Sequence, residues 1–174
     1  MNTQLLHRFE TLERDRIILL KDLSDWPATK LCYSADPRKW SVNQTLLHLL
    51  TSEQLTLRYL KKKSLAMDQL KHSGPTESLK MVLLVISQRL PFMKFKAPAI
   101  LLEATPQYLD MPDLMNQWDE LRFDLKDFLG RIGDQDVTRL VYKHPVAGRL
   151  NLIQCLLFMR EHFHHHLQQI NRCR

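Results

Sequence analysis

The sequence predicts an all-α protein, a four-helix bundle with a long crossover between helices two and three. Four long segments carry apolar residues at the three- and four-residue spacing of one helix face. Only 4 of the 174 residues are glycine, which together with these long periodicities argues against a β-rich fold. A chain of this length is expected to form one domain, residues 1–174, with a sizeable core.

The first two helices are predicted at residues 3–23 and from Ser41 to about residue 62. The first segment has one apolar stripe, formed by Leu5, Leu6, Phe9, Leu12, Ile17, Leu20 and Leu23. The second begins with the sequence SVNQ, a capping box in which the Ser41 hydroxyl and the Gln44 side chain satisfy free backbone N–H groups. The intervening residues 24–39 contain two prolines and are predicted to form a loop.

Residues 64–111 form the long connection. The apolar residues 77–90 are expected to be helical, preceded by a turn over residues 73–77. Four prolines then divide the chain into irregular pieces: Pro91, Pro98, Pro106 and Pro112. A connection of this length between bundle helices suggests a crossover over one end of the bundle, where binding surfaces are common.

The third main helix is predicted to start near Pro112. Its apolar residues step by four and three: Leu114, Trp118, Leu121, Leu125, Phe128 and Ile132. Residues 137–148 are predicted to be a connector, which contains His144-Pro145 and Gly148. The fourth helix is expected to begin at about Asn151, a favourable cap residue, and to run to the end of the chain.

Composition argues against several classes of partner. The net charge is +6, but the densest basic runs fall at predicted helix C-termini, and no aromatic residues are interleaved with them, so nucleic-acid binding is not expected. The longest apolar run, residues 81–86, is too short to span a bilayer, so no membrane association is expected. The three cysteines lack a C-x-x-C pair, which favours reduced thiols and a cytoplasmic location.

Histidines in the fourth helix are the main candidates for chemistry. Residues 162–166 contain four of the eight histidines, and the run is interrupted by Phe163, unlike a purification tag. His162 and His166 are four residues apart, so a helix places both imidazoles on one face, where they can bind one metal ion. No glutamate stands between them as it does in the HExxH helix. A solvated row of histidines is the alternative interpretation.

His48 is the candidate third ligand. It lies about 10 Å from the start of helix two, and His166 about 9 Å from the end of helix four, at 1.5 Å per residue. Short linkers make helices one and two, and helices three and four, antiparallel, whereas the crossover makes helices two and three parallel. Helix four is then antiparallel to helix two, and the three histidines lie at one level of the bundle.

Three further residues are candidates for outer contacts of this site or its pocket. His165 rivals His166 as a ligand and is otherwise interpreted as a packing or outer-shell residue. Gln169 could hydrogen-bond a ligand or lie at the surface. His144 could approach the site from its loop or lie at the surface. A hydrolase would also need a general base, and Glu53 and Glu161 are the nearest carboxylates in sequence, although neither is clearly on the histidine face.

Two segments together resemble the DinB-like superfamily. Residues 40–49, WSVNQTLLHL, resemble its W-S-x-x-x-x-x-x-H-L segment. Residues 161–170, EHFHHHLQQI, resemble its closing H-x-x-x-H-x-x-Q-I segment, and residues 144–150 resemble the loop before that final helix. The order and spacing fit across nearly the whole chain, although residues 64–111 carry no recognisable signature.

The resemblance implies an up-down-down-up four-helix bundle with one divalent metal ion, such as zinc, nickel, iron or manganese, on His48, His162 and His166. It also implies a homodimer. Activities of the superfamily include transfer of low-molecular-weight thiols such as bacillithiol or mycothiol to small electrophiles, and metal-dependent hydrolysis. The absence of a clear base favours thiol transfer. A hydrolase and a non-enzymatic metal-binding or protein-interaction bundle remain alternatives.

Overall fold

The fold is almost entirely helical. The computed structural model describes residues 1–36, 38–89 and 99–173. In chain order, its elements are α1 (Thr3–Leu23), α2 (Ala28–Cys32), α3 (Val42–Ser64), the 3₁₀ turn η1 (Met67–Gln69), α4 (Pro75–Arg89), α5 (Ala99–Ala104), α6 (Met111–Gly130), the 3₁₀ turn η2 (Asp134–Asp136), β1 (Tyr142–His144), β2 (Gly148–Leu150) and α7 (Leu152–Asn171).

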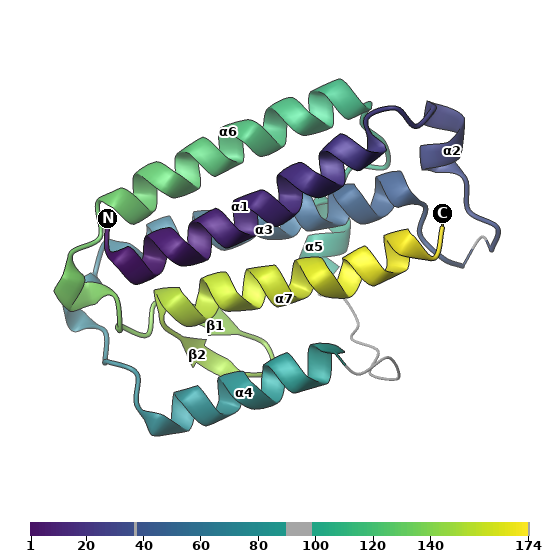
Figure 1. The fold of residues 1–174 in the computed structure, drawn as a ribbon. Helices are drawn as coiled ribbons and strands as arrows, with labels where there is room; N and C mark the ends of the chain where they lie inside the picture. The colour runs from purple at the N-terminus through teal and green to yellow at the C-terminus, as the bar shows by residue number, and fades with distance from the viewer. Residues whose placement is uncertain (37, 90–98, 174) are drawn as a thin grey trace.

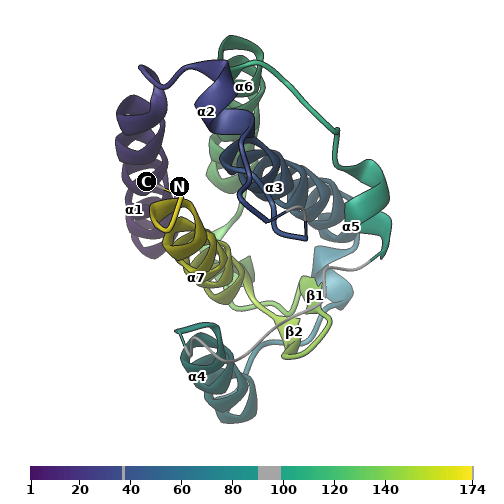
Figure 2. The same ribbon diagram turned by 90° about the vertical axis from the view of Figure 1, so that its right-hand side faces the viewer.

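Four long helices form the predicted bundle. Figure 1 shows α1 and α7 running in one direction and α3 and α6 in the opposite direction, so the up-down-down-up order is confirmed. Helix α7 packs against α1 and α3, and α6 packs against the same two helices on the other side. Figure 2 shows α4 outside this ring, beside α7 and the hairpin. The antiparallel α3 and α7, which carry the candidate ligands, are therefore direct neighbours.

Side-chain caps fix where these helices begin. Ser41 and Asn151 each form a capping box, with Gln44 and Gln154 returning a bond to the cap backbone. Asp110 caps α6 through the backbone N–H of Asp113. The starts of α3 and α7 thus follow the predicted cap residues, and this sets the height of each histidine in the bundle.

The core lies between the four long helices. Most residues of the predicted apolar stripes point inward, but Ile17, assigned to the stripe of the first helix, is 52% exposed, and Leu19 is buried instead. Among the largest fully buried side chains are Trp118, Phe163, Leu46, Leu47 and Leu114. This continuous apolar cluster joins all four helices. Burial on this scale is the main driving force for folding.

The connections contain regular structure that the sequence did not predict. Residues 137–148, predicted only as a connector, include most of an antiparallel hairpin in which Tyr142–His144 pairs with Gly148–Leu150. Gly148 has a φ of 77°, a left-handed conformation that glycine adopts without a Cβ clash. Short helices occupy parts of the predicted loop 24–39 and of the crossover, α2 and α5. Pro37, Pro91, Pro98 and Leu90 lie outside the described residues.

The remaining crossover helix differs little from its prediction. It was expected at residues 77–90 and begins at Pro75, a residue favoured in the first turn. Met81 and Leu84 bury its inner face against the rest of the protein. None of the helices in the described part of the chain is long and apolar enough to cross a membrane.

Candidate metal centre

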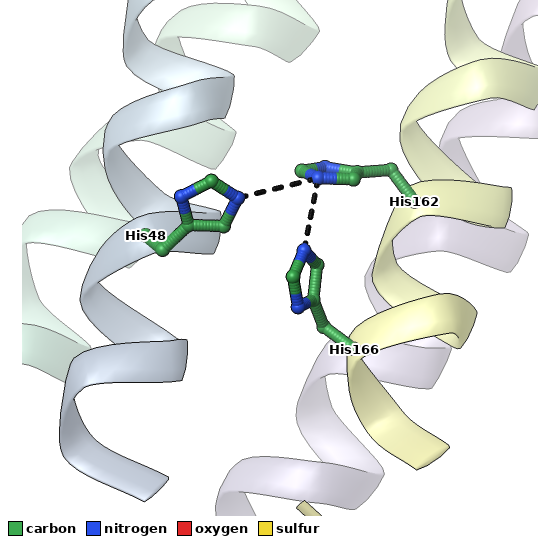
Figure 3. Close-up of side chains that lie close together, drawn as sticks. All are labelled: His48, His162 and His166. Carbon is green, nitrogen blue, oxygen red and sulfur yellow. Dashed lines mark hydrogen bonds between the residues drawn. The ribbon is translucent and has the colours of Figure 1, made fainter. Parts of the chain in front are cut away.

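Three histidines from two antiparallel helices converge on one point. His48 lies in the second turn of α3, and His162 and His166 are one turn apart on α7. Their Nε2 atoms face one another: His48 to His162 is 3.4 Å and His162 to His166 is 3.1 Å, as Figure 3 shows. One ligand nitrogen from each lies within 4.8 Å of the others. The structure thus brings together the three residues selected from spacing.

The spacing of these nitrogens suits one small cation. Nitrogens bound to a tetrahedral zinc ion at about 2.0–2.1 Å are roughly 3.3 Å from one another. The observed separations of 3.4 and 3.1 Å are close to this value. Three imidazoles also form the donor set of open, catalytic metal sites, which leave a further position for water or substrate. The cluster could therefore hold a metal ion.

Burial keeps the three imidazoles in the form that binds metal. Desolvation lowers the pKa of His48 to about 4 and the pKa of His166 to about 3. Burial, followed by the neighbouring histidines, also lowers the pKa of His162 well below its usual value. Near neutral pH each ring is uncharged and keeps one nitrogen lone pair, the requirement for a histidine ligand.

The outer candidates occupy different places. Gln169 lies beside the cluster, with its Oε1 3.0 Å from His166 Nδ1. His165 is outside the cluster, and its Nδ1 is 3.0 Å from the Gln88 carbonyl oxygen. Its ring centroid is 5.2 Å from that of His166. The structure therefore places His166, rather than its rival His165, among the converging nitrogens.

His144 is buried in the hairpin rather than at the surface. Its Nδ1 accepts hydrogen bonds from the backbone N–H groups of Val146 and Ala147, at 3.1 and 3.0 Å. Its ring packs edge-on against Phe158, and Phe158 stacks on His162. Burial lowers the pKa of His144 to about 4, so the ring is neutral. His144 is thus linked to the cluster through one aromatic ring.

Two aromatic residues beside the cluster were not predicted to be part of the site. Trp40 immediately precedes the cap residue Ser41, and its ring centroid lies 4.7 Å from that of His48 and 6.1 Å from that of His166. Phe158 is four residues before His162 on α7, a spacing that predicts contact between their side chains. The position of Trp40 could not be predicted in this way, because it precedes the helix.

Neither candidate base is available to the cluster. Glu53 is buried and accepts a 2.8 Å hydrogen bond from Trp118 Nε1, and Arg122 pairs with it at 2.8 Å. Glu161 accepts two bonds of 2.7 Å from Arg89. Within the described residues, the only three-member group of metal-binding side chains is His48, His162 and His166.

Comparison with known proteins agrees with the fold and the cluster. A family model described as the DinB superfamily matches residues 11–170, nearly the whole chain. The three histidines of the cluster lie inside the matched range. No curated protein and no solved structure matches the chain. By fold, matched range and histidine cluster, the chain belongs to the DinB superfamily.

Proposed function

We propose that this protein is a metal-dependent transferase that joins a low-molecular-weight thiol to a small electrophile in a reducing cytosol. His48, His162 and His166 would hold one divalent ion, for which imidazole suits zinc, nickel or iron, with manganese also possible. One observation carries the proposal. Three neutral imidazoles converge, and the two candidate carboxylates, Glu161 and Glu53, are each paired with an arginine. A site without a carboxylate base suits a reaction whose nucleophile can ionise without one.

A thiol meets this condition. A bound divalent ion lowers the pKa of a coordinated thiol and favours the thiolate, which is the attacking form of sulfur. In the proposed transfer, the sulfur forms a bond to the electrophilic carbon, the leaving group departs with its bonding electrons, and the thiol proton goes to solvent. The protein needs only to hold the ion and to position the electrophile.

Aromatic rings around the cluster could position that electrophile. Trp40 lies against His48 on one side, and Phe158 stacks on His162 on the other. Tyr142 stacks on Phe158 in turn, and burial raises its pKa to about 12, so its hydroxyl stays protonated. These rings give an apolar boundary with one polar tip, as small-molecule sites commonly have.

A thiol-consumption assay tests the proposal. Protein loaded with a divalent ion is mixed with glutathione, bacillithiol or cysteine and a model electrophile such as monochlorobimane. The wild type is expected to consume thiol faster than His162→Ala, and His164→Ala, altered outside the cluster, should retain the wild-type rate. If no thiol is consumed faster by the wild type than by His162→Ala, transfer is excluded and hydrolysis or binding without chemistry becomes the better explanation.

The outer face of α4 supports a second proposal, which concerns assembly. Four aliphatic side chains of α4 are 51–62% exposed, spaced like one helix stripe: Leu79, Val82, Leu83 and Ile86. We propose that this stripe pairs with a second copy of the chain. The pattern is symmetric about its centre, so antiparallel pairing sets Leu79 against Ile86 and Val82 against Leu83. It also sets the acidic first turn of α4 in one copy, which contains Glu77, against the basic last turn of α4 in the other, which contains Arg89.

Light scattering measures this pairing directly. The wild type is expected to have twice the 20.6 kDa mass of one chain at micromolar concentration. Leu83→Arg places a charge at the centre of the stripe and should give monomers. Phe123→Arg is the matched control, because Phe123 is 78% exposed on α6, away from this face. A monomeric wild type, or a Leu83→Arg variant that stays dimeric, contradicts the proposal.

A further inference from the structure

A chain of hydrogen-bonding groups runs from α4 to the histidine cluster. The Gln88 carbonyl oxygen, in the last turn of α4, lies 3.0 Å from His165 Nδ1. His165 Nε2 lies 3.4 Å from Gln169 Nε2, and Gln169 Oε1 lies 3.0 Å from His166 Nδ1. His166 Nε2 then faces His162 at 3.1 Å. We propose that Gln169, held by His165, is a positioning residue that fixes His166 as the tautomer protonated on Nδ1.

The direction of each bond follows from the first acceptor. A carbonyl oxygen can only accept, so His165 Nδ1 carries the proton that it shares with Gln88. In a neutral imidazole, the other nitrogen is then an acceptor, and the Gln169 amide must donate to it. The amide oxygen is left for His166, whose Nδ1 therefore donates. His166 Nε2 keeps its lone pair and presents it to the cluster.

The opposite orientation of the Gln169 amide is unfavourable at both ends. It would place an amide oxygen against the lone pair of His165 Nε2, so two acceptors would face each other. It would also turn the proton of His166 onto Nε2, in the centre of the cluster, where a cation could not bind. The Gln88 carbonyl thus selects the amide orientation, and the amide selects the tautomer.

The helix positions explain why Gln169 can serve both histidines. It lies three residues after His166 and four after His165, the two spacings at which side chains on one helix meet. His48 offers a contrast, because its buried Nδ1 has no hydrogen-bond partner among the described residues. One proposed ligand is therefore oriented by a protein side chain and another is not. The expected effect of Gln169 on metal affinity rests on the proposed metal site. The expected tautomer of His166 does not.

Two measurements test the role of Gln169, and the first needs no metal. In metal-free protein with ¹⁵N-labelled histidine, at a pH where the imidazoles are neutral, nitrogen shifts should show His166 protonated on Nδ1. Gln169→Leu removes the acceptor and should give a mixture of tautomers. Gln168→Leu, an exposed neighbour on the same helix, should leave the spectrum unchanged.

The second measurement is Zn²⁺ affinity by competition with a chromophoric chelator. Outer-sphere partners of histidine ligands typically contribute about 10–100-fold in metal affinity, so Gln169→Leu should weaken binding by that order. Gln169→Glu keeps an acceptor for His166 but loses the donor to His165, so its affinity should be higher than that of Gln169→Leu. Simple loss of packing would not give this difference. His165→Gln, which can still accept from Gln169, should lose less affinity than His165→Ala.

The outcomes separate this inference from the metal proposal. If the wild type binds no Zn²⁺ but His166 is protonated on Nδ1 only when Gln169 is present, the positioning role stands and the metal proposal fails. If Gln169→Leu retains both the wild-type tautomer and the wild-type affinity, the positioning role is overturned. Circular dichroism of each variant verifies that the helices are intact.

Discussion

Replacing His162 with alanine is expected to weaken divalent-ion binding more than any other single change in the cluster. His162 Nε2 is the nitrogen that faces both others, at 3.4 Å from His48 and 3.1 Å from His166. Its removal leaves only two of the three proposed ligands, His48 on α3 and His166 on α7. Because loss of an outer-sphere partner alone costs about 10–100-fold, loss of this ligand should exceed roughly 100-fold. Titration of metal-free protein with Zn²⁺ measures the change.

The fold should survive this substitution. The core is a continuous apolar cluster spanning the four long helices, so we expect folding not to require a metal ion, unlike that of a zinc finger. His162→Ala removes a half-buried ring and should retain the helical circular dichroism of the wild type. His164→Ala is the matched control, because His164 pairs with Asp15 on α1 and lies outside the cluster. Wild-type Zn²⁺ affinity in His162→Ala would contradict the assignment of this ligand.

Much of the fold could be predicted because its signals are local. Ser41 and Asn151 cap their helices with side chains that lie three residues from their partners. The apolar stripes of the long helices repeat over five or more turns, so their faces are clear from spacing alone. The level of His48 relative to His166 followed from helix direction and the rise per residue. These features need no knowledge of distant contacts.

The rest depends on contacts between segments far apart in the sequence. The hairpin has three residues in each strand, too few for an alternating pattern, and His144 is buried by packing against Phe158 rather than by any property of its own segment. Glu53 was a candidate base from sequence distance alone. Its real partners, Trp118 and Arg122, are more than sixty residues away, and no local pattern indicates them.

Those partners make Glu53 the residue whose loss should most destabilise the fold. Glu53 and Arg122 are both nearly fully buried and pair at 2.8 Å. Arg122 also pairs with Glu13 at 3.0 Å, and Glu13 forms a second, close pair with Arg16. Helices α1, α3 and α6 are thus joined by alternating charges inside the bundle. Each charge has lost most of its hydration, so it depends on its partners.

Glu53→Leu leaves Arg122 with one partner, and Trp118 Nε1 without its acceptor. Removing one member of a buried ion pair typically costs about 3–5 kcal/mol. For a chain of this size, each kcal/mol lowers Tm by about 2–4 °C, so a fall of roughly 10 °C is expected. Thermal unfolding followed by circular dichroism measures it. The metal-free protein should be compared in each case, so that ion binding does not contribute.

The double variant Glu53→Leu/Arg122→Leu decides whether an unpaired charge is the cause. It removes both charges and leaves Glu13 paired with Arg16, so no buried ion lacks a partner. Replacing both members of a buried pair with apolar side chains is often neutral or stabilising. Trp118 Nε1 still lacks its acceptor, which costs about 1–3 kcal/mol, so more than half of the lost stability should return. If the double variant is less stable than Glu53→Leu, packing around Arg122, rather than its charge, holds these helices together.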